Sequence, residues 1–347
     1  DVYKRQLFSR QPELYPQFDT LLTHLREARH RMTPYQRHYF DGIRMAAQKN
    51  QELAYREFLA MSELGRFRAA SPLAEKALWT NRPGKSAEVA GWLDKGNGEF
   101  LEPWVAFWPG YWSFYTYALH LTGQYEKELE VAREWQRRFP AFPRYPEQAQ
   151  AKALIGMGAL DQLEPILEDW RARGQLEGIW AIADELWVHG HRDAAREVLE
   201  AEVRRFETAP VYRGRLNNQA MVLHRLGRDE EAHALWEREI NLDRPDPWPW
   251  GVARIGFSAA LVGDTAQARE MERLLCSLPE PQEPYTLFLQ AQIAAALGEK
   301  DRAVRLLEAF ARDGSIPVWL NNLHRNYTLQ RLLGDYPPFQ ELMRTQG

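Results

Sequence analysis

A glycine, or an asparagine in its place, returns along this chain of 347 residues at steps of 34, 39, 35, 32, 37, 36, 35 and 36 residues. A repeat of this length, with helical patterning on both sides of the glycine, is typical of stacked helical hairpins that cannot bury an apolar face alone. The sequence therefore predicts an all-α solenoid, although it does not identify what the solenoid binds. The marker positions are Asn50, Gly84, Gly123, Gly158, Gly190, Gly227, Gly263, Gly298 and Gly334.

Two apolar stripes accompany the markers. One lies five and nine residues after the marker, because residues four apart share one face of a helix. Its clearest pairs are Leu163 and Leu167, Ala195 and Leu199, Ala232 and Trp236, and Ala303 and Leu307. The other lies on the preceding helix, where a small residue seven positions before the marker allows close helix approach: Ala151, Ala183, Ala220, Gly256 and Ala291. The glycine is expected to end that helix in the left-handed conformation.

Residues 226–236 and 297–303 resemble the tetratricopeptide repeat. The shared features are a small residue in the first helix, glycine at the turn, alanine five residues on and a large apolar residue nine residues on. The resemblance covers roughly residues 33–347. It implies a superhelix of about eight hairpins followed by a capping helix, in which the first helix of each hairpin lines a concave groove.

The repeats need no boundary between domains, so residues 7–347 are predicted to form a single elongated unit. Residues 1–6 read as a translation of the transposase mosaic end used in sequencing libraries, and they are left out of the fold prediction. The chain is therefore expected to be a fragment of a longer bacterial protein, taken from metagenomic DNA, whose native N-terminal part is missing.

Charge and composition narrow the class of partner. The formal net charge is −4 and no run of Lys or Arg occurs, which argues against a nucleic-acid or membrane partner for this region. No window of 18 apolar residues is present, so no membrane span is predicted. The single cysteine, Cys276, excludes an intramolecular disulfide and favours a reducing, cytoplasmic compartment. Because it follows Leu274 and Leu275, Cys276 is predicted to lie in the core.

Candidate chemical motifs have simpler interpretations as parts of the repeat. His189, His191 and Asp193 have the spacing of part of a di-zinc ligand set, but the next histidine of such sites is absent and the segment is a repeat turn. Asp184 and Glu185 are adjacent in a predicted helix, so their side chains diverge by about 100° and cannot face one cleft as a catalytic pair. The sequence therefore predicts no catalytic residue, no cofactor site and no metal site.

A third stripe, offset by one residue from the packing stripe of each first helix, is the predicted binding surface. In tetratricopeptide arrays these positions line the concave groove, and here many of them are aromatic or mildly polar. The alternative is that some of them pack between neighbouring repeats. Lys152 lies on the same stripe. The predicted groove residues are Tyr117, His120, Trp180, Asp184, Trp187, Asn217, Met221, His224, Phe257, Phe288 and Gln292.

The order of several segments is similar to that of the helical-repeat region of large bacterial signalling proteins. The segments are residues 32–42, 81–83, 108–112, 120–123 and 128–133. In those proteins the array follows a serine/threonine kinase or a winged-helix regulator. The resemblance therefore implies that an effector domain of the same protein is a candidate partner.

Two functions compete on these grounds. The first is a non-catalytic scaffold or sensor arm that binds a protein or peptide segment in the aromatic-lined groove, without a cofactor. The alternative is an enzyme on an α/α toroid that acts on a carbohydrate or an isoprenoid. Closure distinguishes them, because a toroid returns its last hairpin to its first whereas a solenoid stays open.

Overall fold

The computed structural model describes residues 20, 23–48, 50–94, 109–140, 144–174, 176–208, 214–240, 248–277, 283–313 and 323–344. Within these residues the fold is all-α and contains no strand. Two short 3-10 helices are η2 (Ala28–Arg31) and η3 (Leu160–Gln162). The α-helices are α3 (Pro34–Ala47), α4 (Gln51–Leu64), α5 (Arg66–Trp79), α6 (Pro83–Asp94), α8 (Pro109–Leu121), α9 (Tyr125–Arg138), α10 (Arg144–Gly156), α11 (Glu164–Ala172), α12 (Leu176–Val188), α13 (Arg192–Thr208), α14 (Arg215–Arg225), α15 (Asp229–Glu239), α16 (Pro249–Leu261), α17 (Thr265–Ser277), α18 (Glu283–Ala296), α19 (Lys300–Asp313), α21 (Tyr327–Leu333) and α22 (Pro337–Met343).

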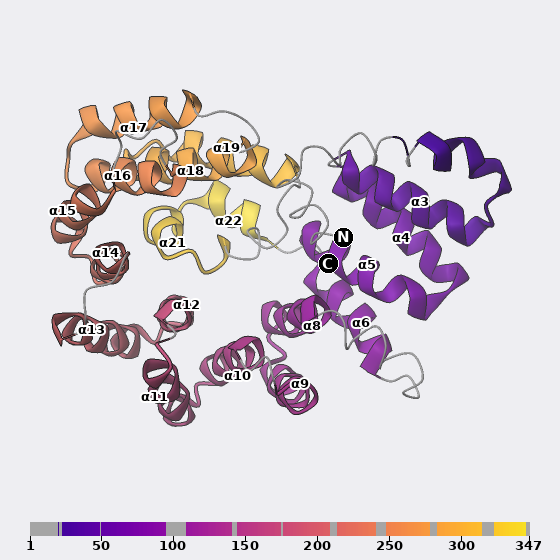
Figure 1. Cartoon of the computed structure of the whole chain (residues 1–347), viewed down its shortest axis with the longest axis horizontal. Helices are drawn as coiled ribbons and strands as arrows, with labels where there is room; N and C mark the ends of the chain where they lie inside the picture. Colours follow the sequence, from indigo (N-terminus) through magenta and orange to yellow (C-terminus); the bar gives the residue numbers. More distant parts are fainter. Residues whose placement is uncertain are drawn as a thin grey trace.

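The helices pack as successive hairpins that form a curved solenoid (Figure 1). Helix α3 packs on α4, α5 on α6, α12 on α13, α14 on α15, α16 on α17 and α18 on α19. First helices of adjacent hairpins also touch, for example α8 with α10 and α10 with α12. Each hairpin thus covers the apolar face that its neighbour leaves open, which confirms the predicted all-α solenoid.

Six of the marker glycines end the first helix of a hairpin in the left-handed conformation, as predicted. Gly123, Gly158, Gly190, Gly227, Gly263 and Gly298 have φ values between 69° and 90°. Three markers were assigned wrongly. Gly84 lies inside α6, and Gly334 ends α21 with a right-handed φ of −53°. Asn50 is the N-cap of α4, where its side chain accepts a hydrogen bond from the backbone N–H of Leu53, and it does not replace a turn glycine.

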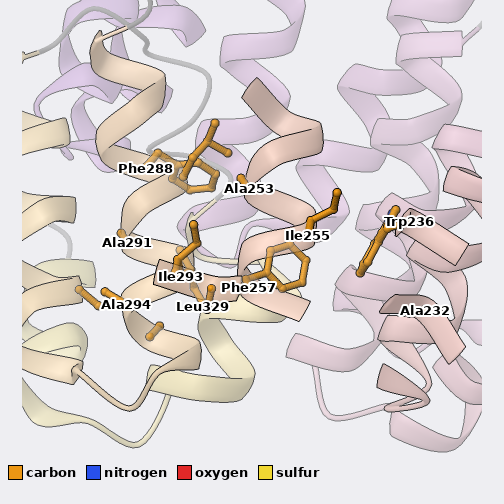
Figure 2. Packing of buried hydrophobic residues seen from close by; sticks show 14 of the residues in the cluster. Ala232, Trp236, Ala253, Ile255, Phe257, Phe288, Ala291, Ile293, Ala294 and Leu329 are labelled. Atoms are coloured by element: carbon orange, nitrogen blue, oxygen red, sulfur yellow. The ribbon is translucent and has the colours of Figure 1, made fainter. Parts of the chain in front are cut away.

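The predicted apolar stripes form the core. The small residue of the first helix is buried in each of the five repeats that carry one, and Gly256 shows why its size is limited. A Cβ atom at Gly256 would lie 2.7 Å from Ile293 Cδ1 and 2.9 Å from Met271 Cβ, so α16 approaches its neighbours more closely than alanine allows. Figure 2 shows part of the largest cluster, which contains both Phe257 and Leu329. Helices α16 and α21 therefore share one core.

Helices α21 and α22 lie inside the curve of the solenoid (Figure 1). Helix α21 contacts α18 and also α12, which is more than a hundred residues earlier in the chain. Its residues Leu329 and Leu333 are fully buried in the main core. Beyond α22, the carbonyl oxygen of Arg344 accepts a 2.8 Å hydrogen bond from Asn81 Nδ2, in the turn between α5 and α6. The two C-terminal helices thus connect distant parts of the arc.

One core prediction is wrong. Cys276 is exposed, because Ala268, Met271 and Leu275 occupy the buried face of α17 and the next residue points about 100° away from it. Residues 1–6 lie outside the described residues, and the single unit over residues 7–347 remains a prediction. Across the described part of the chain, no helix combines the length and the apolar character needed to cross a bilayer.

Candidate functional site

None of the eleven predicted groove residues is exposed. His120, His224, Phe257, Phe288 and Gln292 are buried, and the other six are partly buried. Two of them, Trp187 and His224, are covered by another helix of the same chain. Helix α21 lies against α12, which carries Trp187, and against α14, which carries His224. The inner side of the arc is therefore already in contact with a helical segment.

Helix α21 is held by ring contacts and a hydrogen bond to two of the predicted groove residues. The ring of Tyr327 meets that of Trp187 edge-on, with 5.3 Å between the ring centroids. It also meets the imidazole of His224 edge-on at 5.5 Å. On the next residue of α21, Thr328 Oγ1 lies 2.8 Å from His224 Nε2. Trp187 and His224 thus recognise an aromatic ring and a hydroxyl on consecutive residues of one helix.

The carboxylate of Asp229 links α15 to the same helix. Arg331 Nη2 donates to Asp229 Oδ2 at 2.6 Å, and Asp229 Oδ1 lies 2.7 Å from His224 Nδ1. Thr328, His224 and Asp229 thus stand in the order hydroxyl, imidazole, carboxylate that hydrolases use. Thr328 and His224 are buried, however, and Asp229 is paired with Arg331. The arrangement therefore attaches α21 to the solenoid and does not present a nucleophile to a substrate.

Burial controls the protonation of His224. Loss of hydration lowers its pKa below the usual 6.5, and Arg225 and Arg331 lower the pKa further, against the opposing effect of Asp229. The pKa of Asp229 is also lowered, because His224 and Arg331 together outweigh its burial. The native interface with α21 is therefore built on a neutral imidazole beside an ionised carboxylate.

We expect acidification to weaken the fold through His224. A histidine whose pKa is lowered by folding contributes stability that is complete above the unfolded-state value and is lost as the pH falls below it. The free energy of unfolding of the wild type minus that of His224→Gln should therefore be smaller at about pH 5.5 than at about pH 7.5, by at most about 1.4 kcal/mol per pH unit. Urea unfolding of both proteins at both pH values measures this difference. Titratable groups that the two proteins share contribute equally to both unfolding free energies, so their contributions cancel. The same difference at both pH values would contradict the prediction.

A second group of polar residues, here called the inner charged cluster, consists of His120, Glu128, Glu185, His189 and Arg325. His120 lies between two carboxylates, with Nδ1 2.8 Å from Glu128 Oε2 and Nε2 2.8 Å from Glu185 Oε1. His189 Nε2 lies 3.3 Å from His120 Nε2 and 3.4 Å from Glu185 Oε1. Arg325 Nη1 lies 3.4 Å from Glu185 Oε2. The cluster thus joins two hairpins of the solenoid to the turn that precedes α21.

The repeat itself places four of these side chains. His120 is in the last turn of α8 and Glu128 is in the first turn of α9, so the tight turn around Gly123 brings them together. Glu185 and His189 are four residues apart, at the end of α12 and just after it, and therefore share one face. The stacking of α8, α10 and α12 then brings the two pairs within hydrogen-bonding distance.

Burial and charge act in opposite directions on the pKa values of the cluster. Burial would lower the pKa of His120, but Glu185 and Glu128 outweigh it and raise the value to about 9. Burial would raise the pKa of Glu185, but His120, His189 and Arg325 hold it well below its usual value. Burial prevails at Glu128, whose pKa is raised. When no ligand is bound to the cluster, its centre is therefore an ion pair between His120 and Glu185.

The sequence predicts this cluster only in part. His120 is a predicted groove residue, Glu185 and His189 belong to motifs with other interpretations, and neither Glu128 nor Arg325 is a predicted site residue. The predicted absence of a metal site stays a prediction, although His120, Glu185 and His189 offer ligand atoms that all lie within 4.8 Å of one another. The four-residue spacing of Glu185 and His189 was a usable signal. The third member comes from a helix 65 residues earlier, which no local pattern can place.

Several predicted groove residues make contacts within the solenoid. Both oxygens of Asp184 accept from Arg225, at 2.7 and 2.8 Å. Asn217 Oδ1 accepts from Trp236 Nε1 at 3.1 Å and from Arg254 Nη1 at 2.6 Å. The members that lie in or against hydrophobic clusters are Tyr117, Trp180, Met221, Phe257 and Phe288, and Gln292 is buried on α18. These are the contacts expected of residues that pack between repeats, and a role of these residues in partner binding stays a prediction.

Comparisons with known proteins do not assign the chain to a family. No family model matches the sequence, and a search of curated proteins finds no match. The tetratricopeptide resemblance therefore depends on the repeat pattern, and a function has to be argued from the contacts described above.

Proposed function

We propose that this chain is a non-catalytic interaction scaffold of the tetratricopeptide type, which binds a helical segment of a partner protein on the inner side of its arc. The observation that supports the proposal is the position of α21. Trp187 and His224, which the repeat pattern predicts as groove residues, contact a short helix through an aromatic ring and a hydroxyl. An inner surface that accommodates one helical segment of the chain is suited to accept another of similar chemistry.

The contacts of α21 define what such a segment carries. Tyr327 and Thr328 supply the aromatic ring and the hydroxyl, and Arg331, one turn further, supplies a cation for Asp229. Leu329 and Leu333, four residues apart, enter the core. A partner helix is therefore expected to present an aromatic residue and an arginine on one face and two leucines on another. One candidate source of such a helix is an effector domain of the same protein, which we propose to be bacterial. We also propose that the protein is located in the cytoplasm.

A peptide added in trans tests the proposal. The probe is a fluorescent peptide with the sequence of residues 323–344, and the receptor is the full chain carrying Arg331→Glu, in which the reversed charge faces Asp229 and loosens the chain's own helix. We expect micromolar binding to this variant, and at least about tenfold weaker binding to the wild type, whose tethered segment competes at high effective concentration.

The matched control reverses a charge outside the interface. Arg344 is largely exposed and pairs with Glu341, so the full chain with Arg344→Glu should bind the peptide as weakly as the wild type does. A peptide that itself carries the Arg331→Glu change should not bind any of the three chains. Equal binding to all three chains, or no binding to the loosened variant, would refute the proposal.

The second candidate function is an enzyme on an α/α toroid that acts on a carbohydrate or an isoprenoid. The observation that favours it is partial closure, because Arg344 returns to the turn between α5 and α6 and accepts a hydrogen bond from Asn81. Against it, the inner side of the arc near α12 and α14 is occupied by α21. A thermal-shift screen of the full chain against sugars and isoprenyl diphosphates tests this candidate: a saturable rise in Tm supports it, and its absence removes it.

A further inference from the structure

The inner charged cluster contains three side chains that can bind a metal ion, and they converge on one point. Their ligand atoms are His120 Nε2, Glu185 Oε1 and His189 Nε2, separated by 2.8, 3.3 and 3.4 Å. Around a tetrahedral Zn²⁺ with bonds of about 2.0 to 2.1 Å, neighbouring ligand atoms lie about 3.3 to 3.4 Å apart. Two of the three separations therefore already match, and the third needs to open by about half an ångström.

We propose that His120, Glu185 and His189 form a binding site for one Zn²⁺ ion. Two imidazole nitrogens and one carboxylate oxygen are a ligand set that Zn²⁺ uses, whereas Mg²⁺ and Ca²⁺ take oxygen ligands. Three protein ligands leave a fourth position for water. The proposal is independent of the scaffold function, since its three ligands are not among the residues whose described contacts with Tyr327 and Thr328 support that function.

The surroundings hold the ligands in the orientation that an ion requires. Glu128 Oε2 lies 2.8 Å from His120 Nδ1 and can keep the proton on that nitrogen. When the ion displaces the proton of Nε2, the Nε2 lone pair faces Glu185 and His189. Arg325 lies beside the other carboxylate oxygen of Glu185, which leaves Oε1 for the ion. A carboxylate behind a ligating histidine and a donor behind a ligating carboxylate are the usual supports of a zinc site.

Two of the three ligands are enclosed by the protein, whereas the third is accessible from solvent. The side chains of His120 and Glu185 are 6 % and 3 % exposed, whereas that of His189 is 20 % exposed because it lies just after α12 ends. An ion can therefore enter beside His189, with the ring of Tyr125 next to both imidazoles. Once bound, the ion would connect α8 with α12, two first helices that have α10 between them, and would fix the local curvature of the solenoid.

Titration of Zn²⁺ into the tag-free, EDTA-treated full chain tests the site. We expect one ion per chain by calorimetry, and Co²⁺ in place of Zn²⁺ should give the intense visible absorption of four-coordinate cobalt. His189→Ala should weaken Zn²⁺ binding by more than about tenfold. This variant removes a partly exposed residue outside the helix, so it is expected to fold, and circular dichroism checks that it does.

His191→Ala is the matched control. His191 is two residues further along the same turn and is not part of the cluster, so its removal should leave the affinity unchanged. Glu128→Gln adds a second test, since loss of the carboxylate behind His120 should weaken binding about 10-fold to 100-fold while the three ligands remain. The proposal is overturned if the wild type binds no ion with 1:1 stoichiometry, or if His191→Ala weakens binding as much as His189→Ala.

Discussion

Replacement of Trp236 by alanine is expected to destabilise the chain by about 3 to 5 kcal/mol. Trp236 is fully buried on α15, and its ring packs edge-on against Phe257 with 5.4 Å between the centroids. Its indole N–H also donates to Asn217 Oδ1 at 3.1 Å. The substitution therefore opens a large cavity between two hairpins and removes one of the two described hydrogen bonds that the partly buried Asn217 amide oxygen accepts. Urea unfolding followed by circular dichroism measures the loss.

The same substitution at an exposed tryptophan is the control. Trp248 is 52 % exposed, and its main described contact is the guanidinium of Arg254, 4.8 Å from the ring centroid. Trp248→Ala should cost less than about 1 kcal/mol, which is the range of an exposed cation–π contact. Equal losses for the two variants would mean that Trp236 is not in the core, contrary to the structure.

Replacement of Glu185 by glutamine is expected to cost about 3 to 5 kcal/mol in EDTA-treated protein. The carboxylate is 3 % exposed and faces three donors, His120, His189 and Arg325. Glutamine keeps the size of the side chain but removes the charge, so the buried cation of His120 keeps Glu128 as its remaining hydrogen-bonded carboxylate and Arg325 loses one carboxylate neighbour. Breaking one side of a buried ion pair is costly because the other charge stays out of water.

Glu130→Gln provides the matched control for that change. Glu130 is on α9, its side chain is 70 % exposed, and it pairs with Lys127. Exposed ion pairs contribute about 0 to 1 kcal/mol, so this variant should unfold at nearly the same urea concentration as the wild type. If Glu185→Gln were equally harmless, the inner charged cluster would not contribute to the stability of the solenoid.

The architecture could be predicted from the sequence because its determinants are local. Ten residues are enough to indicate where one helix ends and which face of the next helix is buried. Gly227 marks the end of the first helix, and Ala232 and Trp236 mark the buried face of the second. Stacking then follows from the repeat, since each hairpin presents the same faces as the one before it. The prediction for Cys276 is wrong because the helical period, and not the apolar run that precedes it, decides which side chains of α17 are buried.

The site could not be predicted because its determinants are distant in the chain. The contact of His120 with Glu185 depends on how one hairpin is rotated against another two repeats along, and small differences in loop length change that rotation. The position of α21 inside the arc could not be predicted either, since Gly334 continues the repeat period and the sequence predicts only that a capping helix follows the last hairpin. Burial of Thr328 beside Tyr327 and Leu329 distinguishes this helix, which has contacts on more than one face.

The contacts of α21 also affect how the chain is made. In an ordinary solenoid each hairpin can fold as soon as its neighbour has been synthesised, because contacts are local. Here Arg325 meets Glu185 across 140 residues of sequence. At about 5 to 20 residues per second, a ribosome needs about 7 to 28 s to complete that stretch. During this interval Trp187 lacks its ring contact with Tyr327, so the face of α12 that receives α21 is uncovered on the nascent chain.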